Sequence, residues 1–470
     1  MTQPGRNSPC PCGSGRKYKQ CCQRAQDEEN SLRLRLRGAE GVVVPALLAI
    51  AAESLGPEYV AEAWDEFLVW PDEPTSPEGS PEVGTTFDAF FVFSFVPDAA
   101  ERELPEGWPS EPLALHVLRA EADAIQAFHR EFIEQACRSP ASFFVVESTL
   151  PGRAIDMQDI MTGRRFHVLE QAASRLLQPG HVTYARVLTL AGGSILLGAS
   201  PWIIPASWRI PLIEMREHWR PRRRLTCDEV EEYSIELRET YHAIVDALHH
   251  PEPPRLTNTD GDPLEPTTLA YQLSMPAADA IDRLVPLATL RDEIHVSDEV
   301  VDAGGVAVSA TLSWIKAGNR KQASWDNTIL GTLLVDGSRL VVEVNSARRA
   351  KRIQREIRRR LGAGATLVDT TTQNIDEILA GAVAANTSAA PDELRSPELE
   401  SLESEFRRRH METWLDTKIP ALANRTPRQA VTTARGRERL EAVLDEIAHS
   451  QRDGALAEVA ELRRRLGLVR

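Results

Sequence analysis

Apolar and polar residues alternate in five short runs between Ser142 and about Trp208. Successive side chains of a strand point to opposite faces, so a period of two predicts strands with one buried face. Turn residues such as Gly152 and Gly180 separate the runs. The runs cover residues 143–147, 154–160, 165–169, 182–190 and 194–199. Short strands at this spacing predict a small β-barrel, of OB or SH3-like size, over residues 141–209.

The segments that flank the predicted barrel show helical spacing instead. Apolar residues at intervals of three and four, such as Val43 and Leu47, predict that residues 26–140 are mainly helical. Within that segment, the aromatic-rich residues 87–96 predict a buried strand or a core helix, and residues 114–137 predict one long amphipathic helix. After the barrel, residues 210–285 predict a helical connector.

A second mixed region is expected further along the chain, as an α+β domain over residues 286–385. Strands are expected at residues 306–315, 328–335 and 339–344 because apolar and β-branched residues dominate there. The dipeptide Asp336-Gly337 between the last two runs is a hairpin signature.

The helix expected next, at residues 346–361, is strongly basic. Asn345 or Ser346 would cap its start and Gly362 would end it. Its charged residues are Arg348, Arg349, Lys351, Arg352, Arg355, Arg358, Arg359 and Arg360, against the single acid Glu356. A solvated helix face is one interpretation. The other is a nucleic-acid-binding surface that uses Arg348, Arg352, Arg355 and Arg359, although no aromatic residue stands among them for base stacking.

Residues 398–470 predict a helical C-terminal module, which follows a Ser/Ala/Pro-rich linker at residues 387–397. Thr426, Pro427 and Gln429 suit the N-cap, the first position and the third position of a helix with a capping box. Gly436 is expected to end that short helix. The next helix is expected at residues 437–449.

Composition places the chain among globular proteins. Of its 470 residues, 42% are hydrophobic and 26% are charged, which suits several separate cores. No uninterrupted apolar run approaches the roughly 18 residues of a membrane span, and the N-terminus shows no apolar leader, so neither a span nor a signal peptide is expected. Four clustered and two isolated cysteines fit a reducing compartment, and a cytoplasmic location is expected.

Charge is unevenly distributed. The formal net charge of −15 argues against non-specific nucleic-acid binding by the whole molecule. Residues 1–38 nevertheless carry eight Lys and Arg against three acids, whereas residues 39–100 carry twelve acids and no Lys or Arg. One hypothesis is that the basic N-terminus docks on the acid-only segment until an acidic partner competes. The alternative is a solvated acidic surface.

Four of the six cysteines stand within thirteen residues, as the pairs Cys10 with Cys12 and Cys21 with Cys22. Thiolate is a soft ligand, and Zn²⁺ accepts four thiolates tetrahedrally. Disulfides are the alternative, but Cys-x-Cys and vicinal bridges are strained and require an oxidising compartment. Residues 1–25 are therefore expected to form a knuckle around one structural zinc ion, with no ligand position left open for catalysis.

These residues resemble a known family. The sequence Cys-Pro-Cys-Gly-Ser-Gly, followed by Cys21-Cys22 with Tyr18 and Lys19 between, is similar to the SEC-C motif. That zinc module occurs at the C-terminal tail of the SecA translocase ATPase, where it contacts the SecB chaperone, and in many bacterial proteins. The resemblance implies zinc ligands at Cys10, Cys12, Cys21 and Cys22. The residues expected to contact an acidic protein partner are Arg16, Lys17, Tyr18 and Lys19.

The C-terminal module carries a second resemblance. Trp414, the run Ile419-Pro-Ala-Leu422, Thr426-Pro427 and Gly436-Arg437 resemble the toxin-binding domain of Xre/MbcA/ParS-type antitoxins. Ala423-Asn424 stands where that family usually has a glycine after the leucine. The resemblance implies protein–protein contact, and the core of a plain helical hairpin would explain the same residues.

The motifs together favour a multidomain α+β protein that works by binding. We expect a non-enzymatic, cytoplasmic adaptor that uses one zinc knuckle to contact acidic protein partners. Nucleotide-binding, serine-hydrolase and zinc-protease motifs are absent from the sequence, so no catalytic residue is assigned and an enzyme is the less favoured class. The alternatives are a nucleic-acid- or ribosome-associated factor that uses the basic helix and the barrel, an antitoxin-like regulator, or an unrecognised enzyme.

Overall fold

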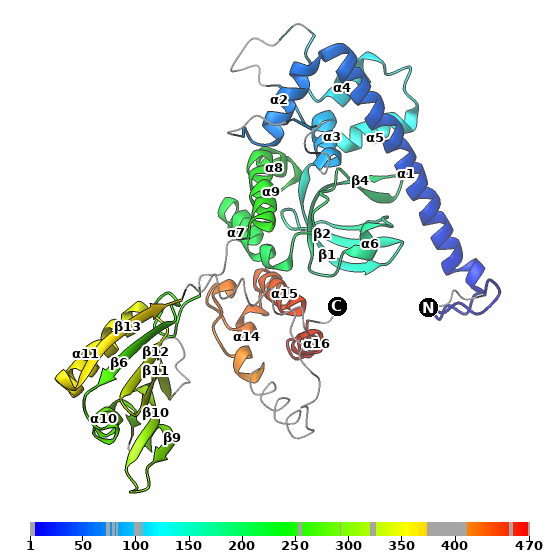
Figure 1. Ribbon diagram of the computed structural model, residues 1–470. Coiled ribbons are helices and arrows are strands. Elements are labelled where there is room, and N and C mark those ends of the chain that lie inside the picture. Colours follow the sequence, from blue (N-terminus) through cyan, green and yellow to red (C-terminus); the bar gives the residue numbers. More distant parts are fainter. Residues whose placement is uncertain are drawn as a thin grey trace. The chain divides into compact units, whose positions relative to one another are not determined.

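The computed structural model divides the chain into two compact units (Figure 1). Unit 1 combines residues 1–250 with residues 396–470, and unit 2 is formed by residues 251–395. The structure describes residues 5–71, 76–77, 80, 83–97, 105, 107–251, 256–291, 293–319, 326–373, 411–450 and 455–468. The linker expected at residues 387–397 lies outside the described residues.

Unit 1 begins with a short 3-10 turn, η1 (Tyr18–Gln20), and a long helix, α1 (Cys22–Ile50). Pro45 lies inside α1 without ending it, and a single π turn, η2 (Ala51–Leu55), continues the same stretch. Gly56 ends it with a φ of 81°, and α2 (Pro57–Phe67) follows. The expected mainly helical segment is present here.

The helices α1 and α2 pack on an aromatic core. Residues 87–96 fall largely in α3 (Gly84–Phe93), so the core-helix alternative is confirmed over the strand. Tyr59, Trp64 and Phe67 of α2 pack against the phenylalanines of α3, with the Trp64 and Phe87 ring centroids 4.9 Å apart. The prediction of one long helix at residues 114–137 was wrong. The structure has two separate helices there, α4 (Leu113–Ala120) and α5 (Ala127–Cys137). The break lets each helix turn its own apolar stripe into this core.

By length and composition, the helical stretch Cys22–Leu55 could cross a membrane, whereas no span was expected from the sequence. It qualifies because α1 continues through Pro45. Its apolar stripe is nevertheless buried in the aromatic core of unit 1. The stripe residues are Leu36, Ala39, Val43, Leu47 and Ala51. In the structure 22% of the apolar window within this stretch is buried.

The five expected strands form a closed barrel in the order β1-β2-β3-β5-β4, which confirms the predicted architecture. Its strands are β1 (Ala141–Leu150), β2 (Ala154–Asp159), β3 (Arg165–Val168), β4 (Val182–Leu190) and β5 (Gly193–Leu197), with the short helix α6 (Ala173–Leu176) between β3 and β4. A parallel contact of Val168 with Ser194 closes the barrel, and the other pairings are antiparallel. Apolar side chains such as Val146, Ile155 and Leu196 fill it.

Helix α1 is braced against this barrel. Arg37 forms an ion pair of 2.6 Å with Glu170 and donates to the carbonyl oxygen of Leu196 at 2.8 Å. Closer to the N-terminus, Arg153 forms an ion pair of 2.7 Å with Glu29. Because the contacts begin near Glu29, the first turns of α1 extend beyond the braced part and carry the cysteine segment (Figure 1).

Three helices follow the barrel as expected: α7 (Arg209–Trp219), α8 (Cys227–Glu232) and α9 (Ser234–His249). The C-terminal helices α14 (Pro427–Ala430), α15 (Ala434–His449) and α16 (Ala455–Arg465) complete unit 1. The capping box of Thr426 and Gln429 is confirmed. Gly436 was expected to end the short helix, and this prediction was wrong. It lies in the first turn of α15, because Thr433 is the N-cap of that helix.

Unit 2 is a six-stranded antiparallel sheet in the order β13-β6-β12-β11-β10-β9. The strands are β6 (Thr267–Leu273), β9 (Val296–Val301), β10 (Ala307–Ala317), β11 (Asn327–Asp336), β12 (Arg339–Val344) and β13 (Ala365–Thr372). A small hairpin pairs β7 (Thr289–Leu290) with β8 (Glu293–Ile294). The expectation that residues 210–285 are only helical was wrong, because β6 lies within them. In β6, Leu269, Tyr271 and Leu273 alternate with less buried residues, as in a strand with one buried face.

Two helices cover the same face of this sheet. Helix α10 (Ala277–Leu284) and helix α11 (Ala347–Leu361) both bury apolar residues in the single core of unit 2. The expected hairpin at Asp336-Gly337 joins β11 to β12, and Gly337 has a φ of 55°. Ser346 caps α11 by accepting from the backbone N–H of Arg349 at 3.2 Å, which confirms the predicted helix start.

Candidate metal centre

The cysteine segment folds as a tight hairpin that leads into α1. Backbone bonds run from the N–H of Cys10 to the carbonyl of Arg16 at 2.8 Å and from the N–H of Tyr18 to that of Ser8 at 2.9 Å. Gly13 and Gly15 take φ values of 78° and 70°, which side chains other than glycine rarely adopt. The hairpin places the first cysteine pair beside the helix start, where the second pair lies.

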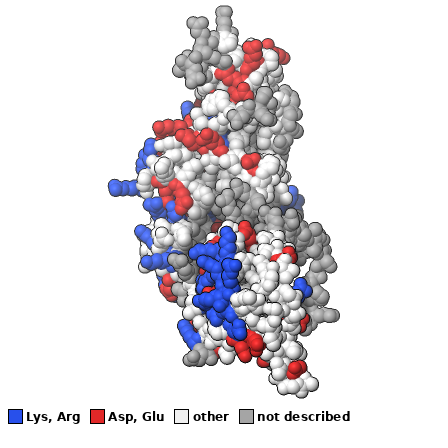
Figure 2. Space-filling model, turned by 60° about the vertical axis from the view of Figure 1, so that its left-hand side comes forward, with Lys and Arg blue, Asp and Glu red and all other residues white. Residues whose placement is uncertain are grey.

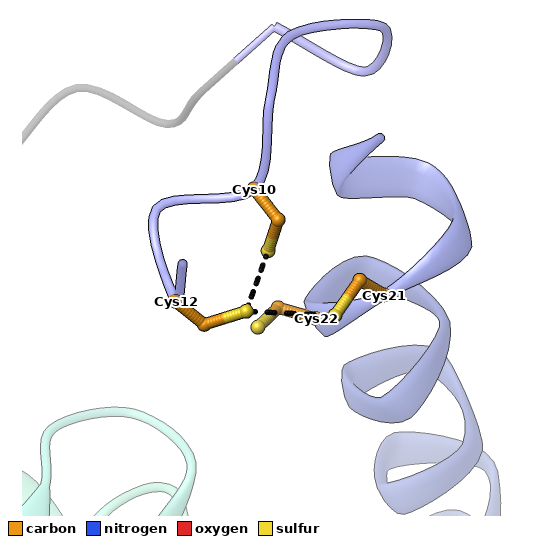
Figure 3. A group of neighbouring side chains, drawn as sticks. All are labelled: Cys10, Cys12, Cys21 and Cys22. Carbon is orange, nitrogen blue, oxygen red and sulfur yellow. Dashed lines mark hydrogen bonds between the residues drawn. The ribbon is translucent and has the colours of Figure 1, made fainter. Parts of the chain in front are cut away.

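The four thiols converge on one point (Figure 3). Their sulfur atoms all lie within 4.8 Å of one another. The Sγ of Cys12 lies 3.3 Å from that of Cys10 and 3.5 Å from that of Cys21. None of the four is in a disulfide. Two ligands come from the loop and two from the start of α1, so a shared metal ion would tie the hairpin to the helix.

The surroundings favour thiolate at part of this cluster. Hydrogen bonds from the side chain and backbone of Ser14 lower the pKa of Cys12 to about 6. The backbone N–H of Cys12 likewise lowers the pKa of Cys10. The proton is retained at Cys22, whose bonds with Cys10 and Cys12 raise its pKa to about 12. Metal ligands must be thiolates, so a cation with its double positive charge would replace the shared protons.

The residues expected to contact a partner differ in exposure. Arg16, Lys17 and Lys19 are exposed around the hairpin. Tyr18 is buried, only 5% exposed, and its hydroxyl donates to Oε1 of Gln26 at 2.8 Å. Tyr18 therefore fastens the hairpin to the second turn of α1, and the three cations form the accessible surface.

The four residues predicted to bind nucleic acid lie on α11 of unit 2, whereas the cysteine cluster belongs to unit 1. Arg348, Arg352, Arg355 and Arg359 are all exposed there. The same helix holds a residue whose role the sequence did not reveal: Arg349 is 4% exposed and forms an ion pair of 2.8 Å with Asp260. No local pattern links residues so far apart in the chain.

Unit 1 also contains a polar arrangement that the sequence did not predict. A groove of about 960 Å³ in unit 1 is lined by residues of the barrel and of the C-terminal helices. In it, Asp156 accepts from the hydroxyl of Ser148 at 2.6 Å and contacts Nδ1 of His167 at 2.7 Å. Burial raises the pKa of Asp156, but these two bonds outweigh it and lower the pKa overall. The carboxylate stands between the serine and the histidine, so this geometry gives no direct transfer of a proton from Ser148 to His167.

Comparison with known proteins identifies the cysteine segment. Residues 6–24 match the SEC-C motif family. SecA of Pelotomaculum thermopropionicum is 82% identical over 22 residues, which are 5% of this chain and 2% of SecA. The uncharacterised protein YecA of Escherichia coli is 80% identical over 20 residues, 4% of this chain and 9% of YecA. A UPF0225 protein of Serratia proteamaculans is 77% identical over 22 residues, 5% of this chain and 14% of that protein.

The comparisons confirm the resemblance to the SEC-C motif and confine it to the hairpin and the start of α1. The chain therefore spans only a small part of the length of these relatives. No solved structure matches the chain. The resemblance of the C-terminal module to antitoxin domains stays a prediction.

Proposed function

We propose that this chain is a zinc-binding interaction protein, whose knuckle contacts an acidic surface on a protein partner. The observation that carries the proposal is the convergence of four thiols within 4.8 Å at the extended end of α1. Four thiolates around Zn²⁺ at about 2.3 Å would be about 3.8 Å apart, which is close to the sulfur distances in the cluster. The match to the SEC-C motif supports zinc as the ion.

The proposed zinc ion has a structural role. Four protein ligands fill a tetrahedral site and leave no position for a substrate. Apart from Cys10, the hairpin buries only Tyr18, so it has too little apolar surface to fold alone. Zinc would supply the missing folding energy by joining the hairpin to α1.

The charge and the position of the knuckle support a partner in trans. Arg16, Lys17 and Lys19 are exposed, which suits an acidic surface. Helix α1 is continuous from Cys22, so Ala39, where the acid-only segment begins, lies about 25 Å along the helix axis. The braced helix thus holds the knuckle away from the first described residues of that segment, which supports a partner in trans. The same short module recurs in relatives of different names, as expected for a portable contact module.

The metal is tested by zinc analysis of the full-length chain. We expect one zinc ion per chain in the native protein and none after Cys21→Ser with Cys22→Ser. The double variant Cys137→Ser with Cys227→Ser is the matched control, because these two cysteines lie outside the cluster. It should retain the full zinc content. A native protein without zinc, or zinc retained by the cluster variant, would contradict the proposal.

The partner surface is tested by affinity capture in which the zinc site remains intact. Lys17→Gln with Lys19→Gln should keep one zinc ion and lose the partners that the native knuckle captures. The control Arg175→Gln with Arg222→Gln removes the same charge from exposed positions elsewhere in unit 1 and should capture them normally. Salt should release these partners, because screening weakens contacts between exposed charges. Equal capture by all three proteins would refute an electrostatic role of the knuckle.

A further inference from the structure

Helix α11 divides into an apolar face and a cationic face. Ile353, Ile357 and Leu361 are buried against the sheet of unit 2, as the sequence pattern predicts. The exposed residues of the opposite face are Arg348, Lys351, Arg352, Arg355, Arg358 and Arg359. We call these six residues the cationic face. Figure 2 shows Lys and Arg gathered in one dense patch on this side of the molecule.

The cationic face is unfavourable for the isolated helix. Its residues stand three and four positions apart, so the guanidinium and ammonium groups of successive turns are neighbours. Like charges at this spacing repel and destabilise a helix. A face that served only for solvation would be expected to alternate Lys and Arg with Glu. Here the one acid, Glu356, pairs with Arg359 and Arg360 at one edge.

The one buried arginine of α11 is paired, in contrast to the exposed residues of the cationic face. Arg349 contacts Asp260 and also donates to Oγ1 of Thr259 at 2.8 Å. By comparison, Lys351, Arg355 and Arg358 have no ion pair with an acid among the described residues. The charge they carry is thus available to an external anion.

We propose that the cationic face of α11 binds the phosphate backbone of double-stranded nucleic acid. This inference is independent of the zinc knuckle and adds a second partner to the proposed function. Fifteen residues give α11 a length of about 22 Å, which matches the rise of about six phosphates along one strand of a duplex. Arginine and lysine side chains are the usual phosphate ligands in such contacts.

The chemistry of the cationic face favours duplex phosphate over other anionic partners. Single strands are held by stacking of their bases on exposed aromatic rings, but Trp314, over which Arg352 lies, is only 3% exposed. Membrane-surface helices need apolar residues that enter the lipid, and those of α11 are buried in the core. Regularly spaced phosphates require none of these.

The overall charge of the molecule does not prevent such contacts. The net charge is −15, but at physiological salt an exposed charge is screened beyond about 8 Å. A phosphate that touches α11 therefore responds chiefly to the cationic face. Contacts to phosphates carry no sequence information directly, so we expect binding with little sequence preference.

The test is fluorescence anisotropy of the zinc-loaded full chain with a labelled duplex of about 20 base pairs, as DNA and as RNA, over a series of salt concentrations. We expect binding at low salt, with log Kd depending linearly on log salt and a slope of about 4 to 5 if most of the face engages. The triple variant Arg352→Gln, Arg355→Gln, Arg358→Gln should lower the slope by about 3 and weaken binding at least about tenfold. The DNA and RNA arms decide which duplex is preferred.

Two matched variants locate the contact. Arg222→Gln, Arg339→Gln, Arg437→Gln removes three exposed charges elsewhere and should bind like the native chain. Lys17→Gln with Lys19→Gln should also bind normally, which separates this surface from the knuckle. Melting temperatures of the triple variant should equal or exceed the native value, since repulsion is relieved. No duplex binding at low salt, unchanged binding by the triple variant, or tighter binding to a single strand or to anionic phosphatidylserine vesicles would overturn the proposal.

Discussion

Individual residues in this fold carry conformations that their types do not favour. Ala423 and Asn424, after the short 3-10 turn η8 (Pro420–Leu422), have φ values of 57° and 58°. This left-handed conformation is less favourable for a residue with a Cβ atom than for glycine, because the Cβ atom approaches the neighbouring carbonyl oxygen. The predicted resemblance to antitoxin domains would place a glycine at this position. The two observations are consistent, because a left-handed residue after Leu422 is what the turn requires.

Replacing Ala423 by glycine should therefore stabilise unit 1. We expect the free energy of unfolding to rise by about 1 kcal/mol, because glycine relieves the left-handed strain. Chemical denaturation of the full chain measures it. Ala448→Gly, within α15, is the control and should instead lower the free energy by about 1 kcal/mol. If both variants lose stability equally, the backbone strain at Ala423 is not relieved as described.

Residue-level signals also explain what could be foreseen. Thr426 and Ser346 act as helix caps because their hydroxyls accept from a nearby backbone N–H, and that chemistry is local in sequence. The prediction that Gly436 ends a helix was wrong because the role of this glycine depends on tertiary packing and not on local sequence. A Cβ atom there would lie 2.1 Å from the carbonyl oxygen of Ala430, so the close approach requires glycine inside the helix. Tertiary contact of this kind leaves no mark on the local pattern.

At the scale of elements, the C-terminal helices are held to α7 by ion pairs buried between them. Glu217 of α7 accepts from both Arg435 and Arg439 of α15. Arg216 forms a two-bond pair with Glu438, at 2.8 and 2.9 Å. Burial raises the pKa of Glu217, but the hydrogen bonds from the two arginines outweigh it and lower the pKa. The stability of this interface depends on both partners of each ion pair, because a buried charge without a partner is strongly destabilising.

Glu217→Gln should consequently loosen the C-terminal helices. Loss of the carboxylate leaves the buried Arg439 with Glu214, at 3.0 Å, as its remaining acidic partner, at a cost of about 1.5–3 kcal/mol. Denaturant unfolding, together with proteolysis of α15, measures the effect. Glu446→Gln on the exposed face of the same helix is the matched control and should change stability by less than about 0.5 kcal/mol. Similar effects of both changes would show that the ion pairs contribute little.

The elements themselves were predictable to different degrees. The barrel strands followed from the alternation of buried and exposed residues, since a slip by one position would expose the whole core face. The break between α4 and α5 was missed because neither glycine nor proline marks residues 121–126. It arises from packing, since Val117 and Phe132 both reach the aromatic core. For the metal centre, the cysteine spacing sufficed, because all four ligands lie within one short segment.

At the scale of the whole molecule, histidine burial couples stability to pH. Burial lowers the pKa of His242, whose Nε2 lies 2.8 Å from the carbonyl oxygen of Phe67. Burial, and then the nearby His449, lower the pKa of His181. In the unfolded chain both histidines titrate near pH 6.5. Below that pH the unfolded state binds protons that the folded state resists, so acid favours unfolding.

We therefore expect a melting temperature that is constant above about pH 7 and falls as the pH drops below about 6.5. The measurement is best made in the Cys21→Ser, Cys22→Ser variant, so that acid release of metal does not contribute. His242→Gln keeps a side-chain N–H for the Phe67 carbonyl and should flatten the dependence. A variant that retains the native pH profile would remove His242 as a source of the acid sensitivity.

Unit 1 is completed only by the last part of the chain, since residues 251–395 form unit 2 between its two segments. During synthesis the barrel and α7 therefore leave the ribosome long before α15 exists. Until then Arg209 and Arg216 lack their acidic partners Asp445 and Glu438. Glu217 lacks Arg439 and keeps its 3.9 Å contact with Arg216. A nascent chain stalled before residue 434 should thus expose a charged, unclosed surface on unit 1. Premature termination anywhere in unit 2 would accordingly leave incomplete the unit that carries the knuckle.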